Sequence, residues 1–504
     1  MRTVKDPQMQ LGEVDISQIK FDPKSRDDIP QILKGLQYIY TTLPVREEIF
    51  KLLEQHILPD KNKSNGRPGM ELWTIFVMGV LRLNLNWDYD RLHNQVNYHA
   101  LIRQMLGHGI FDTVVSYQLQ TIKDNVSLLT PELLAEINQV VVKAGHCLVK
   151  KKENDPLHGR CDSFVVETNV HFPTDINLLF DAMRKVITLS ADLCDRHGLS
   201  DWRQHRYNVR QVKRLMRTAQ NKKRAKANTE EQKKKRDALI VEAHQDYLHV
   251  AQGYLNKAHY TLETLETLEK RGISNPSDRL IEESIKNFVH HAVRQIDQIK
   301  RRVILGEAIP HHEKVFSLFE PHTEWVSKGK TRAPVELGLK VCLLEDQYQF
   351  ILHHKIMEKQ TDEQVAEAIV RETKNFFPEL NSCSFDKGFY SSKNQKILGE
   401  QLALAVLPKK GKLSQQARAI EQAEDFIKAR QKHSAVESAI NALEVHGLDV
   451  CPDHGIDGFK VYVALAVVAR NIQRIGAILK QKEQKREEKI RKYFYPASQF
   501  KLAA

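Results

Sequence analysis

The sequence predicts a multidomain protein with an all-helical N-terminal region, a mixed α/β domain and a large helical insertion after its first strand. Two observations lead to this prediction. The chain has 504 residues, which is too long for one ordinary domain. Helical periodicity dominates residues 32–147 and 175–318, whereas short β-branched or aromatic runs stand near residue 162 and after residue 336.

The changes of pattern also set the expected domain boundaries. The α/β domain is discontinuous, because the helical stretch interrupts it after one strand. We expect a helical N-terminal domain at 1–150, an α/β domain at 155–180 and 320–475, a basic helical insertion at 181–319 and a charged C-terminal helix at 476–504.

The N-terminal region should form a compact helical bundle. Segments such as ELWTIFVMGVLRL and PELLAEINQVVVKAG repeat apolar residues every three or four positions, and the linker-like SNGRPGM separates two helical stretches. Such a bundle either presents basic side chains to DNA or only supports and dimerises the rest of the chain. The sequence gives these two interpretations similar weight.

The first strand lies in RCDSFVVETNVHFPTD, where Phe164, Val165 and Val166 form a β-branched and aromatic run. A polar, helix-favouring insertion follows, and only Glu230 and Glu231 oppose its many cations. This stretch suits contacts with phosphates, or it forms a solvated helical face or coiled-coil arm. Its cations are Arg203, Arg206, Arg210, Lys213, Arg214, Arg217, Lys222, Lys223, Arg224, Lys226, Lys233, Lys234, Lys235 and Arg236.

After residue 336, strands and helices alternate. LGLKVCLLE and YQFILHHKIM read as a hairpin joined by Asp346-Gln347, and a helix with a capping box from Thr361 to Gln364 follows. Then come the strand NSCSFD, a helix after Ser391 and Ser392, the strand LALAVLP and one long helix through residues 416–444. With the insertion removed, this order is close to that of an RNase H-like domain, a mixed sheet flanked by helices.

Composition limits the partners and the compartment. The chain carries 76 Lys and Arg against 64 Asp and Glu, so its net charge of +12 favours a polyanionic partner, with nucleic acid first. Its six cysteines include no Cys-x-x-Cys pair, which argues against a disulfide framework or a zinc site and fits a reducing cytoplasm. Neither a signal peptide nor a membrane span is expected.

Three carboxylates are candidates for metal-dependent chemistry. Cleavage of a phosphodiester by two Mg²⁺ ions needs hard oxygen ligands from separate elements. Asp162 lies on the first strand, Asp386 ends the fourth, and Glu437 comes from the helix expected over that edge. Each also has a structural interpretation, since Asp386 can end a strand in a turn and Glu437 can be a surface residue. Glu167 and Asp175 compete with Asp162.

Several blocks of the chain resemble a known family. RCDSFVVETNVHFPTDINLL is similar to the first catalytic block of bacterial insertion-sequence transposases of the DDE type, and FDKGFYS to the second. KHSAVESAINALEVHGLD, with the later HGIDGFKVYVALAVVARNI, resembles the third block and its extension, and NGRPGMELWTIFVMGVLRLN resembles the N-terminal region. The nearest subgroup is the one catalogued as ISNCY. The blocks occur in the family's order over most of the chain.

The resemblance implies that Asp162, Asp386 and Glu437 hold Mg²⁺ or Mn²⁺, two ions in all, and that the substrate is double-stranded DNA. Asp162 would bridge both metals, with Asp386 completing one site and Glu437 the other. Relatives often carry an Arg four residues before the catalytic Glu and a Lys seven after it, where this chain has His433 and Glu444. Candidate DNA contacts are therefore Arg430, Lys432 and His433, together with Lys222, Lys223 and Arg224 in the insertion.

Three functions are compatible with the sequence. The first is an active transposase, cytoplasmic and nucleoid-associated in a bacterium, that binds the terminal inverted repeats of its element as a dimer or higher oligomer. It would cleave DNA and transfer strands. The second is a catalytically inactive DNA-binding protein of transposase descent, and the third an RNase H-like nuclease that cuts without joining.

Overall fold

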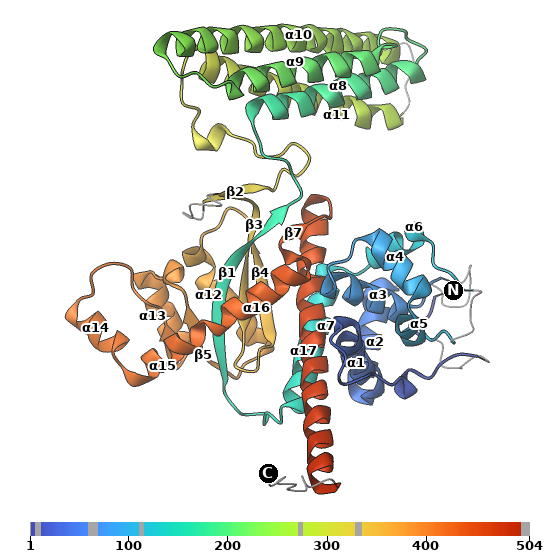
Figure 1. The fold of residues 1–504 in the computed structure, drawn as a ribbon, viewed down its shortest axis with the longest axis vertical. Coiled ribbons are helices and arrows are strands. Elements are labelled where there is room, and N and C mark those ends of the chain that lie inside the picture. Colours follow the sequence, from blue (N-terminus) through green and yellow to red (C-terminus); the bar gives the residue numbers. More distant parts are fainter. Residues whose placement is uncertain are drawn as a thin grey trace, which may run out of the picture. The chain divides into compact units, whose positions relative to one another are not determined.

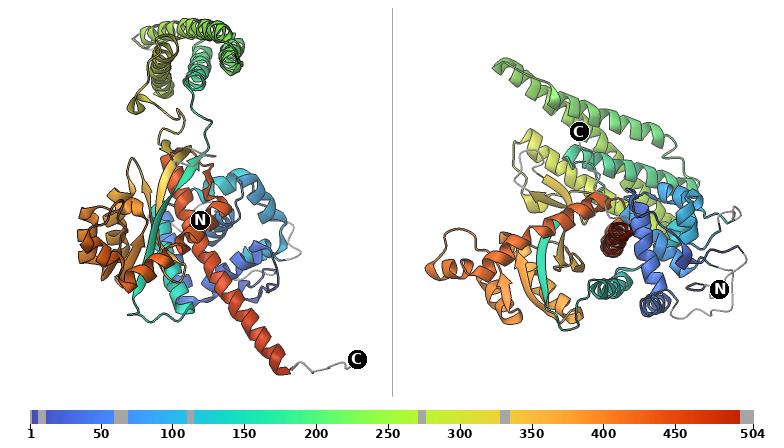
Figure 2. Two further views of the ribbon diagram at one scale, coloured as in Figure 1. Left: turned by 60° about the vertical axis from the view of Figure 1, so that its left-hand side comes forward. Right: turned by 60° about the horizontal axis from the view of Figure 1, so that its bottom comes forward.

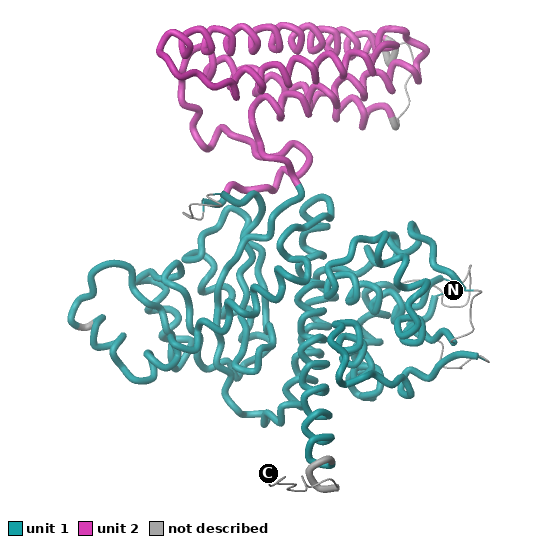
Figure 3. Tube along the Cα trace, viewed as in Figure 1, with its two compact units in different colours: residues 1–169, 326–504 teal, residues 170–325 magenta. Residues whose placement is uncertain are grey.

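The computed structural model describes residues 2–5, 12–58, 69–109, 115–270, 276–327 and 335–494. The chain divides into two compact units, unit 1 (Met1–Asn169 with Val326–Ala504) and unit 2 (Val170–Trp325), as Figure 3 shows. Each unit has an apolar core of its own. The N-terminal helices therefore share one core with the sheet. Most of the expected SNGRPGM linker lies outside the described residues.

Short helices build the N-terminal part of unit 1, as the periodicity predicted. Aspartate or threonine side chains cap several of them, and Asp27, Asp88 and Thr130 each accept a backbone N–H at a helix start. The third helix is buried along all 13 of its residues instead of on one face. The helices are α1 (Asp28–Thr41), α2 (Leu43–Ile57), α3 (Leu72–Asn84), α4 (Tyr89–Tyr98), α5 (Ala100–Met105), α6 (Leu119–Val126) and α7 (Pro131–Leu148), after the 3₁₀ turn η1 (Ile16–Gln18).

The long helix α17 (Gly455–Phe494) is the centre of unit 1. It packs against α1, α3 and α7 on one side and against the sheet strand β4 (Ile351–Met357) on the other (Figure 1). The crossing with α1 is close, because a Cβ on Gly476 would lie 1.9 Å from the carbonyl oxygen of Gln31, and one on Gly35 would lie 2.3 Å from that of Ile472. Only glycine allows the two backbones to approach in this way.

The predicted charged tail at 476–504 continues the same helix as far as Phe494, and residues 495–504 lie outside the described residues. Gln484 donates a hydrogen bond to the carbonyl of Pro23 and Lys480 to that of Ser25, so this part of α17 contacts the chain segment before α1. Among the described residues, one stretch, Gly455–Ile490, is long and apolar enough to cross a membrane. Of its apolar window, 78% is buried inside the structure, which is the environment of a core helix in a soluble protein.

A mixed, open sheet forms the other half of unit 1. Strand β1 pairs antiparallel with β3 and parallel with β5; β4 pairs antiparallel with β3, and β6 parallel with β5. The described strands follow the order β2-β3-β1-β5-β6, with β4 also on β3 and β7 on β1. They are β1 (Leu157–Thr168), β2 (Glu324–Ser327), β3 (Val335–Glu345), β4, β5 (Leu380–Phe385), β6 (Leu404–Val406) and β7 (Val450–Cys451).

The helices around the sheet confirm most of the predicted order. The capping box of Thr361 and Gln364 starts α12 (Asp362–Phe376), and Ser391 caps α13 (Ser392–Gln401). The single long helix expected at 416–444 is wrong, because the segment breaks into α14 (Gln415–Glu421), α15 (Glu424–His433) and α16 (Ala435–Leu443). Ala423 is extended at the first break, and at the second the Ser434 hydroxyl donates to the carbonyl of Gln431.

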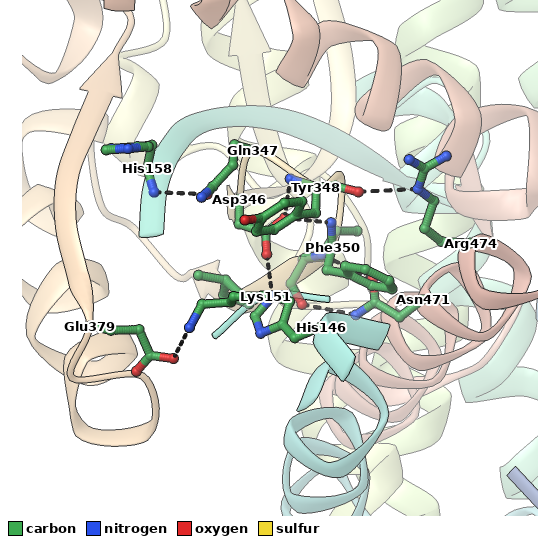
Figure 4. Close-up of polar contacts among 12 residues, drawn as sticks. His146, Lys151, His158, Asp346, Gln347, Tyr348, Phe350, Glu379, Asn471 and Arg474 are labelled. Atoms are coloured by element: carbon green, nitrogen blue, oxygen red, sulfur yellow. Dashed lines mark hydrogen bonds and ion pairs between the residues drawn. The ribbon is translucent and has the colours of Figure 1, made fainter. Parts of the chain in front are cut away.

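The turn between β3 and β4 connects the sheet to the helices (Figure 4). Buried Asp346 accepts the N–H groups of Tyr348 and Phe350, and its other carboxylate oxygen lies 2.5 Å from Nε2 of His146 on α7. Asn471 of α17 accepts the N–H of Ile351 at 2.9 Å and donates to its carbonyl at 2.9 Å. Side chains from the two helices α7 and α17 therefore fix the β3–β4 turn and the start of β4.

Unit 2 is a bundle of four helices with its own core (Figure 2). Buried residues such as Val212 and Met216 line the inner face of the second helix of this bundle, His205–Arg224. The cations of that helix are exposed on its outer face, so this part of the basic stretch is a solvated face of the bundle. Trp202 donates a hydrogen bond to Thr261 in the interior. The helices are α8 (Asp175–Arg196), α9 (His205–Arg224), α10 (Glu230–Lys270) and α11 (Pro276–Ile299).

Candidate functional site

The first two predicted carboxylates lie on neighbouring parallel strands. In the register of β1 and β5, Arg160 is level with Ser384 and Cys161 with Phe385. Asp162 comes one residue after Cys161, and Asp386 comes one residue after Phe385. Asp162 is within β1, half-buried, and accepts the N–H of Ser163 at 2.7 Å, while Asp386 begins the turn after β5 and is exposed. Both therefore lie at the same end of the pair.

The third carboxylate reaches this place from a helix. Glu437 is an exposed residue in the first turn of α16, and Val436 and Ile440 beside it are buried. Helix α16 packs on β1, as the sequence predicted, whereas α15 packs on β5 and β6. The break at Ser434 separates these two packing directions, and it places Glu437 near the positive end of a new helix.

The charges of the other carboxylates act on Asp162. The pKa of Asp162 is raised from 3.8 to about 6, mainly because burial disfavours its charged form, and the charges of Asp386, Asp362 and Glu437 raise it further. The Ser163 N–H opposes this shift. A carboxylate whose charge is unfavourable for these reasons is one that a cation would stabilise.

His433 connects the helix side to the strand side. Its Nδ1 lies 3.1 Å from the Ser384 hydroxyl on β5. Burial lowers the pKa of His433, whereas the charges of Asp386 and Glu437 oppose that decrease. The imidazole is therefore close enough to two of the predicted metal ligands for their charges to act on it.

The sequence missed a fourth carboxylate, Asp362. Its Oδ1 accepts a hydrogen bond from the Ser163 hydroxyl at 2.6 Å, and Lys340 donates to both of its oxygens at 3.2 and 2.9 Å. A Cβ on Gly388 would lie 3.0 Å from Asp362 Oδ2, so the residue also borders the turn after Asp386. The capping box beside it was the signal, but that motif explains a helix start without any site.

The competing carboxylates of the first block lie elsewhere. Asp175 is in unit 2, where it forms an ion pair with Arg302 at 2.6 Å. Glu167 is on β1 level with Gly338, five residues beyond Asp162. The charges of Asp386 and Glu437 are among the causes that raise the pKa of Asp162, so Asp162 is the carboxylate of this block that is electrostatically linked to the other two.

The predicted DNA contacts fall into two groups. Arg430 and Lys432 are exposed on α15, and Arg430 lies 3.6 Å from Glu421. Burial lowers the pKa of His158 on β1, and the positive charge of Lys432 lowers it further, which indicates that this lysine is near the same strand pair. Lys222, Lys223 and Arg224 are exposed in the last turn of α9, in unit 2.

The chemistry of the donor set fits hard divalent cations. Asp162, Asp386 and Glu437 offer oxygen ligands of the type that Mg²⁺ and Mn²⁺ prefer, and two of the three are open to solvent. Among the described residues, no three His, Cys, Asp or Glu side chains are already arranged as ligands of one ion. The repulsion at Asp162 supports the fit, because a bound cation would remove it.

None of the six cysteines forms a disulfide, and Cys161 and Cys342 bring their sulfur atoms to 3.3 Å inside the sheet. Burial raises the pKa of Cys161 and of Cys383, so these thiols are protonated packing groups and not nucleophiles. The carboxylates at the end of β1 and β5 are thus the candidate reactive groups in this sheet. Comparisons of the chain with protein-family models, curated proteins and solved structures found no match.

Proposed function

We propose that the protein is a DDE transposase with an RNase H-like catalytic domain. The observation that carries this proposal is the grouping of Asp162, Asp386 and Glu437 at one end of a parallel strand pair. Apart from the short strands β2 and β7, the order β1, β3, β4, α12, β5, α13, β6 and then the helices α14 to α16 is close to the order expected for an RNase H-like domain. The resemblance of the sequence blocks to insertion-sequence transposases supports the same assignment.

In this proposal, Asp162, Asp386 and Glu437 hold two Mg²⁺ or Mn²⁺ ions. When bound, these ions supply Lewis-acid activation of a phosphodiester and of the attacking water or DNA 3′-hydroxyl. Asp162 orients its carboxylate through the Ser163 N–H, and Ser163 in turn bonds Asp362. Lys340 neutralises Asp362, so that the fourth carboxylate supports Asp162 without adding an unpaired charge.

Double-stranded DNA is the proposed partner, as transposon ends and as target. Exposed Arg430 and Lys432 lie on the helix beside the carboxylates, and the outer face of α9 adds a second cationic surface. His433 would fulfil a positioning role near the phosphate. We further propose a homodimer or higher oligomer during end joining and a cytoplasmic, nucleoid-associated location, which fits the buried environment of the apolar part of α17.

The deciding experiment measures cleavage and strand transfer on labelled duplex DNA that carries the terminal repeats of the element. The intact protein is compared with Asp386→Asn and Glu437→Gln in Mg²⁺ and in Mn²⁺, and Glu424→Gln on exposed α15 is the matched control. We expect metal-dependent joining in the intact protein and the control, and its loss in both site variants.

Each other outcome selects a different function. Binding of the repeats without cleavage by any protein would favour the catalytically inactive DNA-binding protein. Cleavage without joined product would favour a nuclease. Full activity of Glu437→Gln together with loss in Asp362→Asn would show that Asp362 is the third ligand and that the glutamate was assigned wrongly.

A further inference from the structure

Unit 2 contains a pocket that the proposed catalytic site does not use. Its volume is about 640 Å³, within the range of small-molecule and cofactor sites. Residues Phe172 to Asn177, which belong to the HFPTD block of the sequence and the start of α8, form one wall. The end of α9 and the segment from His311 to Trp325 form others. The HFPTD block, which follows the strand of Asp162 in the sequence, therefore lines a cavity within unit 2.

One side of the pocket is aromatic. The rings of Phe172 and Trp325 meet edge to face with their centroids 5.6 Å apart, and Phe316 lies 5.6 Å from Trp325. His311 extends this group, at 5.3 Å from Phe316. Phe172 remains 57% exposed, although it lies in a pocket wall. An exposed ring beside two others is a surface on which a flat ring can stack.

The rest of the pocket is cationic. Lys223, Arg224, Arg302 and Lys314 line it, and only Asp175 opposes them among its lining side chains. Arg302 is paired with Asp175 at 2.6 Å, which leaves an excess of positive charge on the remaining three. The first turn of α8, capped by Thr174, also lines the pocket, and the N-terminal end of a helix favours negative charge. The pocket therefore favours an anionic ligand.

Two side-chain amides complete the lining. Gln220 of α9 donates to Asn177 of α8, and both belong to the pocket wall. Side-chain amides offer a donor and an acceptor together, the pattern that matches the edge of a nucleobase. Stacking rings, excess cations and amides thus combine the three kinds of contact that a nucleotide needs.

We propose that this pocket binds a nucleotide that is unpaired in a DNA strand, with its base against Phe172 and Trp325 and its phosphates at Lys223, Arg224 and Lys314. A base inside a duplex cannot reach such rings, so the nucleotide must leave the stack. This inference rests on the proposed function in one respect, namely that the bound polymer is DNA. Binding in the pocket does not require that the protein cleaves the DNA.

The test is binding of the full-length protein in EDTA to three probes that contain 2-aminopurine. The probes are a fully paired duplex, the same duplex with the 2-aminopurine unpaired, and the free deoxynucleotide monophosphate. We expect the unpaired probe to bind roughly tenfold more tightly than the paired one, with quenching of its fluorescence by stacking. The free nucleotide should bind far more weakly, because it lacks the flanking phosphates.

The variants separate the pocket from general charge. Phe172→Ala and Trp325→Ala should abolish the preference and the quenching, whereas Tyr207→Ala, which removes an equally exposed ring outside the pocket, should leave both intact. Phe172 is the safer of the two for folding because its ring is more than half exposed. Thermal unfolding of each variant identifies any loss that comes from misfolding.

The results distinguish this proposal from the catalytic one. Equal affinity for the paired and unpaired probes would refute nucleotide binding in the pocket, even if the protein cleaves DNA. An unchanged preference of folded Phe172→Ala for the unpaired probe would refute it as well. Equal affinity for the free nucleotide and the unpaired strand would also overturn it, in favour of a free nucleotide ligand. If the protein prefers the unpaired probe but does not cleave DNA, the result would support nucleotide binding in the pocket and count against the transposase function.

Discussion

Replacing Asp162 with asparagine should stabilise the metal-free protein while it abolishes DNA cleavage. The raised pKa of Asp162, about 6 against 3.8, means that the folded state resists the charged form. Each pKa unit corresponds to roughly 1.4 kcal/mol, so the largest penalty is about 3 kcal/mol. Solvent screening at this half-buried position reduces the expected gain to about 1–2 kcal/mol. Asparagine keeps the oxygen that accepts the Ser163 N–H.

The pH dependence gives the sign of this effect. Below pH 3.8 the carboxyl is protonated in both the folded and unfolded states and contributes no penalty. The penalty grows as the pH rises from 3.8 to about 6 and is complete above that value. The difference in unfolding free energy between Asp162→Asn and the intact protein should therefore be largest near pH 8 and should shrink as the pH falls towards 4.

Urea unfolding in EDTA at pH 8 and pH 5 measures this difference, and the exposed Asp425→Asn is the control. Adding Mg²⁺ should stabilise the intact protein more than Asp162→Asn, since a ligand of the folded state raises stability only where it binds. A variant that is less stable at pH 8, or a gain in stability that does not depend on pH, would refute the argument that the folded state disfavours the charged form of Asp162.

Other predictions concern the core of unit 1 and the basic face of unit 2. Gly476→Ala should lower the unfolding free energy by about 1–3 kcal/mol, because its Cβ would lie 1.9 Å from the Gln31 carbonyl oxygen. In the control Gly399→Ala the new Cβ would have no atom within 4 Å, so urea unfolding should show no loss of stability. Asn471→Leu should cost about 2–4 kcal/mol in the same assay, since the backbone N–H and carbonyl of Ile351 lose a buried partner. Alanine at Lys222, Lys223 and Arg224 together should reduce the dependence of log affinity for duplex DNA on log salt by up to about 2.7, and an unchanged slope would remove these residues from the interface.

Features that depend on neighbouring residues in the chain could be predicted from the sequence. The capping box at Thr361 starts α12 where expected, and the short strands β5 and β6 coincide with NSCSFD and LALAVLP. The break at Ser434 was missed because helix-favouring residues surround it. Its cause is tertiary, since α15 and α16 pack on different strands.

The candidate site could be predicted only in part, for the same reason. The neighbouring positions of Asp162 and Asp386 follow from the order of strands, which the periodicity gives. Asp362 could not be found in this way, because its link to Ser163 joins residues that are 199 positions apart. The shared core of the N-terminal helices and the sheet is likewise invisible in local pattern, since α17 supplies it from the other end of the chain.

The central position of α17 has a consequence for how the protein is made. Helices α1, α3 and α7 leave the ribosome long before α17 is synthesised, yet their apolar faces are covered by it. Until then these apolar faces lack their partner and are exposed to solvent, which makes them targets for chaperones and for aggregation. A chain assembled in this order completes the core of unit 1 only after α17 has been synthesised, so truncation before residue 455 should leave the N-terminal helices without their packing partner.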